Sequence, residues 1–560
     1  MAGKSKYIVA VIGTAVVAAG AFAAYTFLLK GPSGDASGAL ASAKIVPDEA
    51  IMAGYITTDP QAWAKIEQFG TPEAQKLFAK GLEEFNKGAE KEGFSYEKDI
   101  KPWVGGIMFA MLPPSPVKPA QAKASNKPEP ELLMVIGIKD KIAALNFTKK
   151  VDKKVKTKET EYKGLKITES ITEIKTDTKG DTKNTPSYTA ILDNNYVVYG
   201  SSKRSIEQAI DTFKGEPSLL SKQGASEILS KGADLKNTVA QFYIPDYAGM
   251  IDSLIKSDPE MAKIPPKALD SLKQVKSMVV GFGIDDAGIR MKATANLDPK
   301  LNVYQYEPTN SKIVSTLPAD TLALINGQGV NRWWDAMLNQ SKDFPELQTA
   351  LGAARTYTRY ANIDLDKEVF AWMDGEFALA AIPSDKGLLA QTGFGGALVF
   401  DTKDDKTAKS MFAKLDSLAK TQNVSVKQRN IGSKQVTEWD IPNQGAVVAH
   451  GWLDQDTVFV ALGAPIADVL TTQNGKSLES DDSFKTITSS LQKPNGGYFY
   501  LDMDKTMVLV DKFATGANAI DPQSKALLSS IRGISMTATS SDKTSSQVEM
   551  LLSLKSKGSK

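Results

Sequence analysis

The residue types that most often carry out catalysis are scarce in this chain. Its 560 residues include one histidine, His450, and no cysteine, which excludes disulfides, thiolate chemistry and cysteine-built zinc or iron–sulfur sites. A serine–histidine–aspartate triad would have to use His450. That residue lies beside Gly451 and Trp452 on an expected strand, and no G-x-S-x-G motif is present. We therefore expect a structural histidine, and a metal site built on several histidines is excluded.

Two short motifs could support other chemistry, but their surroundings argue against it. Ser540-Ser541-Asp542-Lys543 matches the S-x-x-K pattern of serine–lysine nucleophiles, yet it lies in a turn rich in serine and threonine. Gly281-Phe282-Gly283 precedes Ile284-Asp285-Asp286 and a turn, so it lacks the helix N-terminus that would hold a phosphate. The sequence predicts no catalytic, cofactor-binding or metal-ligating residue and therefore no enzyme, with a site built only on carboxylates left as an alternative.

Surface contacts are better represented than catalytic motifs. Eight lysines and only two aspartates lie between Lys139 and Lys158. Such a cluster is typical of a solvated helix face, and contact with anionic headgroups or an acidic partner is the functional alternative. Trp333 has no counterpart in the first half of the chain and is expected to be exposed. The candidate contact residues are Lys149, Lys150, Lys153, Lys154, Lys156 and Trp333. A net charge of +2, without aromatic residues among these lysines, predicts no nucleic-acid partner.

The elements that would position these residues occur twice along the chain. Phe94–Trp103 aligns without a gap with Ile363–Trp372, apolar on apolar and acid on acid, and other landmarks keep the same order. The spacing changes only between blocks, where loops tolerate insertions. Further matched landmarks are Pro47 with Pro318, Trp63 with Trp334, Leu192-Asp193 with Leu453-Asp454, and Phe242-Tyr243 with Phe499-Tyr500.

This repetition predicts two homologous units of the α+β class, with mainly antiparallel sheets and flanking helices. The first covers residues 45–297 and the second 312–554, joined by a linker at 298–311 and followed by a tail at 555–560. Each unit ends in an expected hairpin, at 278–297 and 534–554, because two β-rich runs flank a short polar turn. Asp59-Pro60 predicts a helix start, with an aspartate cap and proline at the first helical position.

The N-terminus predicts a membrane anchor over residues 1–30. Residues 7–29 form an apolar run of 23 residues, long enough for a helix to cross a bilayer core of about 30 Å. Lysines before the run place the N-terminus in the cytoplasm and the body on the other side. A cleaved signal peptide ending near Ala21-Phe22-Ala23 is the alternative. A tether at 31–44, rich in glycine and serine, follows.

These features resemble an uncharacterised family of cyanobacterial membrane-anchored proteins that carry a duplicated domain of unknown function. The residues that carry the resemblance are the anchor, the openings Val46-Pro47-Asp48 and Leu317-Pro318-Ala319-Asp320, and the turns at 103–106 and 372–375. The resemblance implies a body in the periplasm or thylakoid lumen. It brings no catalytic residues and no cofactor.

The sequence is therefore most typical of a non-enzymatic, membrane-anchored interaction protein, a scaffold or assembly factor outside the cytoplasm. Its partners would be the membrane, through residues 7–29, and proteins that the sequence does not identify. A binder or carrier of apolar molecules or lipids is the main alternative. Its cavity would lie between sheet and helices and be lined by Met108, Phe109, Met111, Phe377 and Leu379. An enzyme of unrecognised type is the second alternative, and the oligomeric state stays open.

Overall fold

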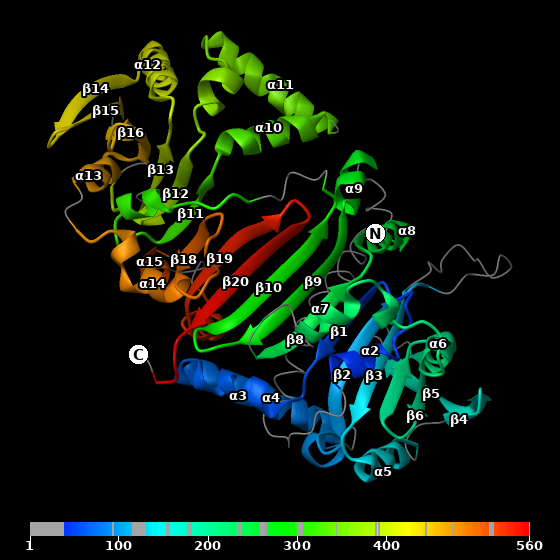
Figure 1. Ribbon diagram of the computed structural model, residues 1–560. Coiled ribbons are helices and arrows are strands. Elements are labelled where there is room, and N and C mark those ends of the chain that lie inside the picture. Colours follow the sequence, from blue (N-terminus) through cyan, green and yellow to red (C-terminus); the bar gives the residue numbers. More distant parts are fainter. Residues whose placement is uncertain are drawn as a thin grey trace.

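Figure 1 shows the computed structural model of the chain. The structure describes residues 38–558, except for 92–94, 115–129, 153–156, 176–181, 232–234, 236, 258–263, 265, 300–305, 343, 387–388, 390–391, 443–444, 473–474 and 514–519.

The first half of the described chain contains ten strands with helices between them. Its elements are α2 (Ala39–Ala43), β1 (Met52–Ile56), α3 (Pro60–Ala64), η1 (Lys65–Gln68), α4 (Pro72–Lys91), η2 (Tyr96–Ile100), β2 (Val104–Leu112), β3 (Glu131–Ile138), α5 (Lys141–Asp152), β4 (Thr157–Tyr162), β5 (Leu165–Lys175), β6 (Thr182–Leu192), β7 (Tyr196–Gly200), α6 (Lys203–Phe213), η4 (Leu219–Ser221), α7 (Ala225–Lys231), β8 (Thr238–Ile244), α8 (Tyr247–Ser257), α9 (Pro266–Lys273), β9 (Val275–Ile284) and β10 (Gly288–Leu297). As predicted, the carboxylate of Asp59 caps α3 by accepting a hydrogen bond from Gln61 N, and Pro60 is the first residue of the helix.

The second half repeats this order of elements. They are η7 (Lys312–Thr316), β11 (Ala323–Gln328), α10 (Val330–Ser341), α11 (Pro345–Tyr360), η8 (Leu365–Phe370), β12 (Glu376–Pro383), β13 (Phe394–Asp401), α12 (Asp405–Thr421), β14 (Ser425–Ile431), β15 (Lys434–Ile441), β16 (Gly445–Trp452), β17 (Thr457–Leu462), α13 (Ala464–Thr472), η10 (Leu478–Ser480), α14 (Asp482–Thr488), β18 (Tyr498–Asp502), α15 (Met503–Phe513), α16 (Pro522–Leu528), β19 (Ile531–Asp542) and β20 (Ser545–Leu554). The blocks aligned in the sequence both contain a short π-helix, η2 and η8.

All the named strands belong to one antiparallel sheet. From one edge to the other the order is β4-β5-β6-β7-β3-β2-β1-β8-β9-β10, and then β20-β19-β18-β11-β12-β13-β17-β16-β15-β14. The pairing pattern of the first half is thus the mirror of that of the second. Both predicted terminal hairpins, β9–β10 and β19–β20, are present.

The expected fold class is wrong as a whole, although its α+β, mainly antiparallel character is correct. Two units with separate sheets were expected, but β10 pairs with β20 from Gly288 to Asn296, and the sheet runs through both halves (Figure 1). The physical reason is that each terminal hairpin would otherwise leave an unpaired edge strand. A second correction concerns the prediction of a transmembrane helix. Within the described ranges no helix is both long and apolar enough to cross a bilayer, and residues 7–29 lie outside them. The unit boundaries stay a prediction.

Helices bury one face of the sheet in each half. In the first half α2, α6 and α7 pack on a core that includes Met108, Leu133 and Tyr243. In the second half α13 and α14 pack on a core that includes Leu324, Val399 and Tyr500. These two cores lie on the same face of the sheet, which we call the helix-covered face.

Candidate functional site

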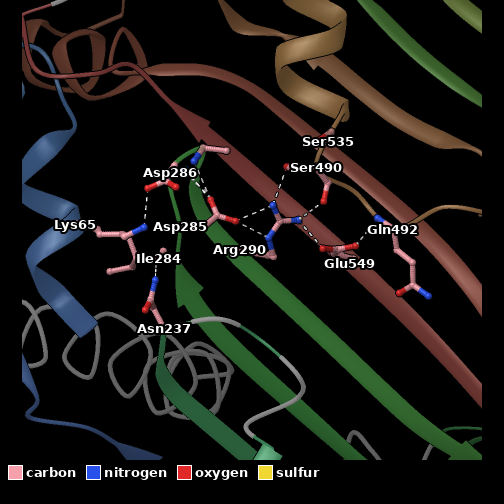
Figure 2. A network of polar contacts seen from close by, with 12 residues as sticks. Lys65, Asn237, Ile284, Asp285, Asp286, Arg290, Ser490, Gln492, Ser535 and Glu549 are labelled. Carbon is pink, nitrogen blue, oxygen red and sulfur yellow. Dashed lines mark hydrogen bonds and ion pairs between the residues drawn. The ribbon is translucent and has the colours of Figure 1, made fainter. Parts of the chain in front are cut away.

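A buried ion-pair network joins the two halves on the helix-covered face of the sheet (Figure 2). Arg290 on β10 donates from Nη1 to Glu549 Oε1 on β20 and from Nε to Asp285 Oδ2, at 2.5 and 2.8 Å. Its Nη2 donates to Ser490 Oγ at 2.7 Å, and Gln492 N donates to Glu549 Oε2 at 2.8 Å. Every guanidinium nitrogen has an acceptor and both Glu549 oxygens have donors, so this network is a structural clasp without a group left over for chemistry.

His450 has the structural environment that its sequence context predicts. Its Nε2 lies 2.8 Å from Asp416 Oδ1, the same oxygen that accepts from Trp439 Nε1, and its ring stacks on Phe412 with centroids 4.6 Å apart. Burial acts to raise the pKa of Asp416, but the hydrogen bonds from His450 and Trp439 outweigh it and lower that pKa. The ring of Trp439 also lies edge-on to that of His450, with centroids 6.1 Å apart, so Asp416, Phe412 and Trp439 together hold His450 in place.

Other candidate polar groups in the described part of the chain also make structural contacts. No three of its histidine and acidic side chains are placed to hold a metal ion together. Ser540, the first residue of the S-x-x-K match, lies on β19 and accepts a hydrogen bond from Tyr306 N at 3.0 Å. Glu376, whose pKa burial raises, accepts from Ile313 N at 3.0 Å and from the hydroxyl of Thr309. These groups support structure rather than a reaction centre.

The structure describes two of the five predicted contact lysines, Lys149 and Lys150. Lys150 is not a free cation: its Nζ lies 2.5 Å from Asp99 Oδ2 in the π-helix η2. The same pair recurs in the second half, where Lys414 lies 2.5 Å from Glu368 and lowers the pKa of that carboxyl. Lys149 is exposed on α5. Lys153, Lys154 and Lys156 lie outside the described residues. The duplicated ion pair therefore fixes a helix against a π-helix, and of the predicted lysines that the structure describes Lys149 is the exposed one.

Trp333 is exposed on α10, with 61% of its surface accessible, as its lack of a counterpart predicted. Its neighbour Trp334 is buried, stacks on Phe370 at 3.9 Å and donates to Asp366 Oδ1. The structure does not bring Trp333 together with Lys149 and Lys150, because α5 lies beside the first half of the sheet and α10 beside the second (Figure 1).

The face of the sheet opposite the two cores carries an uninterrupted row of apolar side chains. Residues directly opposite one another on antiparallel strands point to the same face, so the registers define this row. It runs from β17 to β6 through Val460, Leu398, Leu379, Ile325, Phe499, Met536, Met550, Met291, Phe282, Ala240, Ile56, Ile107, Ile136, Val197 and Ile191. We call this set the apolar row.

Neighbouring elements bury much of the apolar row but leave one stretch accessible. Helix α12 packs over Leu398 and Val460, residues of α3 and η1 over Ile56 and Phe282, and residues of α5 over Ile107 and Ile136. Between these covers Leu379, Ile325 and Met536 are 46%, 45% and 38% exposed, and the half-buried Phe499 and Met550 join them. We call these five residues the open patch. Contiguous exposed apolar surface of this kind marks a binding site more often than chance.

The sequence suggested part of this surface but placed it wrongly. The cavity expected between sheet and helices would have been lined by Met108 together with Phe109, Met111, Phe377 and Leu379. Met108 lies in the helix-covered core, whereas the other four alternate to the opposite face. Runs such as 107–112 are apolar on both faces, and periodicity does not tell which face helices cover. The missed signal is that these strands lack the polar alternation of a solvated face.

Comparison with known proteins identifies a family. A family model described as "Protein of unknown function (DUF3352)" matches residues 10–554. The chain belongs to this family. The description assigns it no activity, and no curated protein matches the chain. Crystal forms I, III and IV of TP0453 share 9 to 11% identity over 46% of this chain and 78 to 80% of TP0453, with TM-scores of 0.24 to 0.25. Similarity at that level carries no argument about this member of the family.

Proposed function

We propose that this protein is a non-enzymatic interaction protein, a scaffold or assembly factor, that holds an apolar segment of a partner protein against the open patch. The single observation that supports this proposal is the exposure of Leu379, Ile325 and Met536 in register on adjacent strands. The satisfied networks around Arg290 and His450 provide no reactive group for an enzymatic alternative.

The dimensions of the open patch favour an amphipathic helix as the bound segment. Five neighbouring strands spaced by about 4.8 Å extend over roughly 19 Å, the length of a helix of about 13 residues. Met536 and Met550 add flexible, polarisable side chains that adapt to the shape of a bound helix. Burying each exposed aliphatic side chain contributes on the order of 1 kcal/mol or more, enough for a specific and reversible contact.

We also infer how this protein arose and where it acts. The matching order and pairing of strands in the two halves support an origin by duplication. The resemblance of the sequence is the ground for proposing a cyanobacterial family. The apolar sequence of residues 7–29 supports export of the body to the periplasm or thylakoid lumen, whether that segment is kept or cleaved. Both statements stay predictions.

Photo-crosslinking tests the proposed contact. A benzoylphenylalanine at position 325 should form an adduct with a protein in intact cells, and mass spectrometry should map the adduct to an amphipathic helix. Position 171 on β5 is the matched control, because Ile171 is 46% exposed but lies outside the open patch. Leu379→Lys, directly opposite position 325, should reduce the adduct at least tenfold. Equal adducts at 325 and 171, or no effect of Leu379→Lys, would reject the proposal.

A carrier of apolar molecules is the second candidate, because the same open patch would accept an acyl chain. Extraction of the purified protein with organic solvent separates the two functions. A stoichiometric lipid in the extract that disappears in Leu379→Lys, together with lipid adducts only at position 325, would favour the carrier over the scaffold.

A further inference from the structure

Helix α5 exposes apolar side chains that its counterpart in the second half lacks. Ile142 and Leu145 are 72% and 44% exposed, although both lie in an ordered helix packed on the sheet. Ile142, Leu145, Asn146 and Lys149 follow the spacing i, i+3, i+4, i+7 and therefore share one face of the helix. All four are exposed. An isoleucine this exposed on a rigid helix has no role in the folded core.

The counterpart helix shows that the position itself does not require apolar residues. Helices α5 and α12 are equivalent because both begin after an aspartate cap, Asp140 and Asp404, and both bury an alanine four residues later. In α12 the positions equivalent to Ile142 and Leu145 are occupied by Lys406 and Lys409, which are exposed. The apolar character of the α5 face is thus specific to the first half.

The charges beside this face indicate what it meets. Lys141 and Lys149 flank Ile142 and Leu145, and neither forms an ion pair with any residue that the structure describes. In α12 the residue equivalent to Lys141 is Asp405, which binds Lys409 at 2.6 Å. An apolar stripe with lysines at its border matches the interface of a bilayer that carries anionic headgroups, where the alkyl groups enter and the ammonium groups stay at the surface.

We propose that the exposed face of α5 is a contact site for an anionic lipid surface. Ile142 and Leu145 insert between headgroups, and Lys141 and Lys149 pair with phosphates. The contact is weak and reversible, since it involves two aliphatic side chains and two cations, and it orients the sheet relative to the bilayer. This site is separate from the open patch, so it does not depend on the proposed function.

A fluorescent label tests the site in the full-length chain. The chain has no cysteine, so Asn146→Cys creates a unique site for an environment-sensitive dye on the α5 face while keeping all four contact residues. Ser410→Cys is the matched control, because Ser410 is the equivalent exposed residue of α12. The signal is local, and any membrane attachment through another segment affects both labelled proteins alike.

The expected result is a blue shift and at least a doubling of emission at position 146 with vesicles of phosphatidylglycerol and phosphatidylcholine. The expected changes are absent with phosphatidylcholine alone and absent at position 410. Lys141→Gln and Lys149→Gln should each lower the partition coefficient roughly fivefold. Ile142→Ser with Leu145→Ser should remove the blue shift.

Three outcomes would overturn the proposal. The first is an unchanged emission at position 146 with anionic vesicles. The second is an equal change at positions 146 and 410, which would show general adsorption of the protein. The third is an equal response to poly-glutamate, which would assign the lysines to an acidic protein partner instead of a lipid surface.

Discussion

The two halves of the sheet share one pairing pattern but differ in how their exposed face is closed. In the first half Gly54 lies between Phe109 and Phe242, and the two rings approach each other over it with centroids 5.5 Å apart. In the second half the same position in the pairing pattern holds Ile325, which separates Leu379 from Phe499. The first half covers its own face, and the second leaves Ile325 and Leu379 exposed.

This difference teaches that topology alone does not decide where a binding surface lies. A β-carbon on Gly54 would lie 2.4 Å from Phe109 Cζ, so the ring contact depends on glycine. With isoleucine at the equivalent place, the neighbouring side chains are held apart and remain accessible. The residue at this position thus contributes, together with the covering helices, to whether the apolar surface is closed or open.

The largest effect is expected from weakening the contact between the two halves where β10 pairs with β20, which we call the seam. Arg290→Ala leaves the buried carboxylate of Glu549 and the partly buried one of Asp285 without their cation, and we expect a loss of about 3 to 5 kcal/mol in unfolding free energy. Denaturant titration followed by circular dichroism measures the loss, and hydrogen exchange should increase in β10 and β20.

Lys292→Ala is the control for the seam. Lys292 lies on the same strand and the same face, directly opposite Glu549, but is less buried than Arg290. We expect it to cost less than about 1 kcal/mol. Equal losses of unfolding free energy for the two variants would mean that the ion-pair network around Arg290 contributes no more than a surface charge.

Alanine substitution at the two equivalent positions, Gly54 and Ile325, compares how each half is closed. Gly54→Ala forces the Phe109 ring to move and should cost about 1 to 3 kcal/mol, the usual range for overpacking. Ile325→Ala should cost under about 1 kcal/mol, because the side chain is 45% exposed. Thermal unfolding of both variants measures the difference. If Ile325→Ala proves the more destabilising of the two, the open patch is buried in the native protein.

A third test uses the pair of Asp416 and His450, which belongs to the second half. Asp416→Asn weakens the bonds to His450 and Trp439 and should cost about 1 kcal/mol at pH 7. Because the folded state lowers the pKa of Asp416 below its ordinary value of 3.8, this stability is present above that value and is lost as pH falls through the folded pKa. The denaturation midpoints of variant and wild type should therefore differ at pH 7, and the difference should shrink as the pH falls below 3.8 through the folded pKa.

His450→Gln extends the same test to function. It should leave partner binding and localisation unchanged, since the histidine is structural. A complete loss of function with a normal level of folded protein would contradict the non-enzymatic proposal, because a general base typically contributes a factor of 10² to 10⁴ in rate.

The smallest expected effect comes from removing the ion pair that occurs in both halves. Lys150→Met and Lys414→Met each remove the ion pair between a helix and a π-helix, at Asp99 and Glu368. Both pairs are partly exposed, so each change should cost about 0.5 kcal/mol after solvent screening. Similar values from denaturant titration would support equivalence of the halves, and a difference above about 1 kcal/mol would argue against it.

Local features of the sequence predicted much of the fold. The turn at Asp285–Gly288 predicted the β9–β10 hairpin, and the aligned blocks that end at Trp103 and Trp372 fold into equivalent π-helices. The pairing of β10 with β20 could not be predicted, because it joins segments far apart in the chain and no local pattern encodes it. The same holds for the bond from Lys150 to Asp99 and for Glu549 opposite the guanidinium of Arg290.

The sequence indicated the apolar composition of the candidate site but not the face of the sheet on which it lies. The apolar character of residues such as Phe109 and Leu379 was visible, but a strand with two apolar faces does not reveal which face is covered. The exposure of Trp333 was predicted from the comparison of halves. The exposed Ile142 was not, since an isolated apolar residue on a helix with mixed character resembles an ordinary core position.

The pairing of β10 with β20 also determines how long β10 lacks a partner strand during synthesis of the chain. β10 leaves the ribosome with its hairpin partner β9, but its other neighbour is encoded roughly 250 residues later, which takes about 12 to 50 s at ordinary elongation rates. Throughout that interval the growing polypeptide presents an unpaired strand that other nascent chains could join. Production of the protein should therefore depend on a chaperone that shields this edge until the last hairpin has been made.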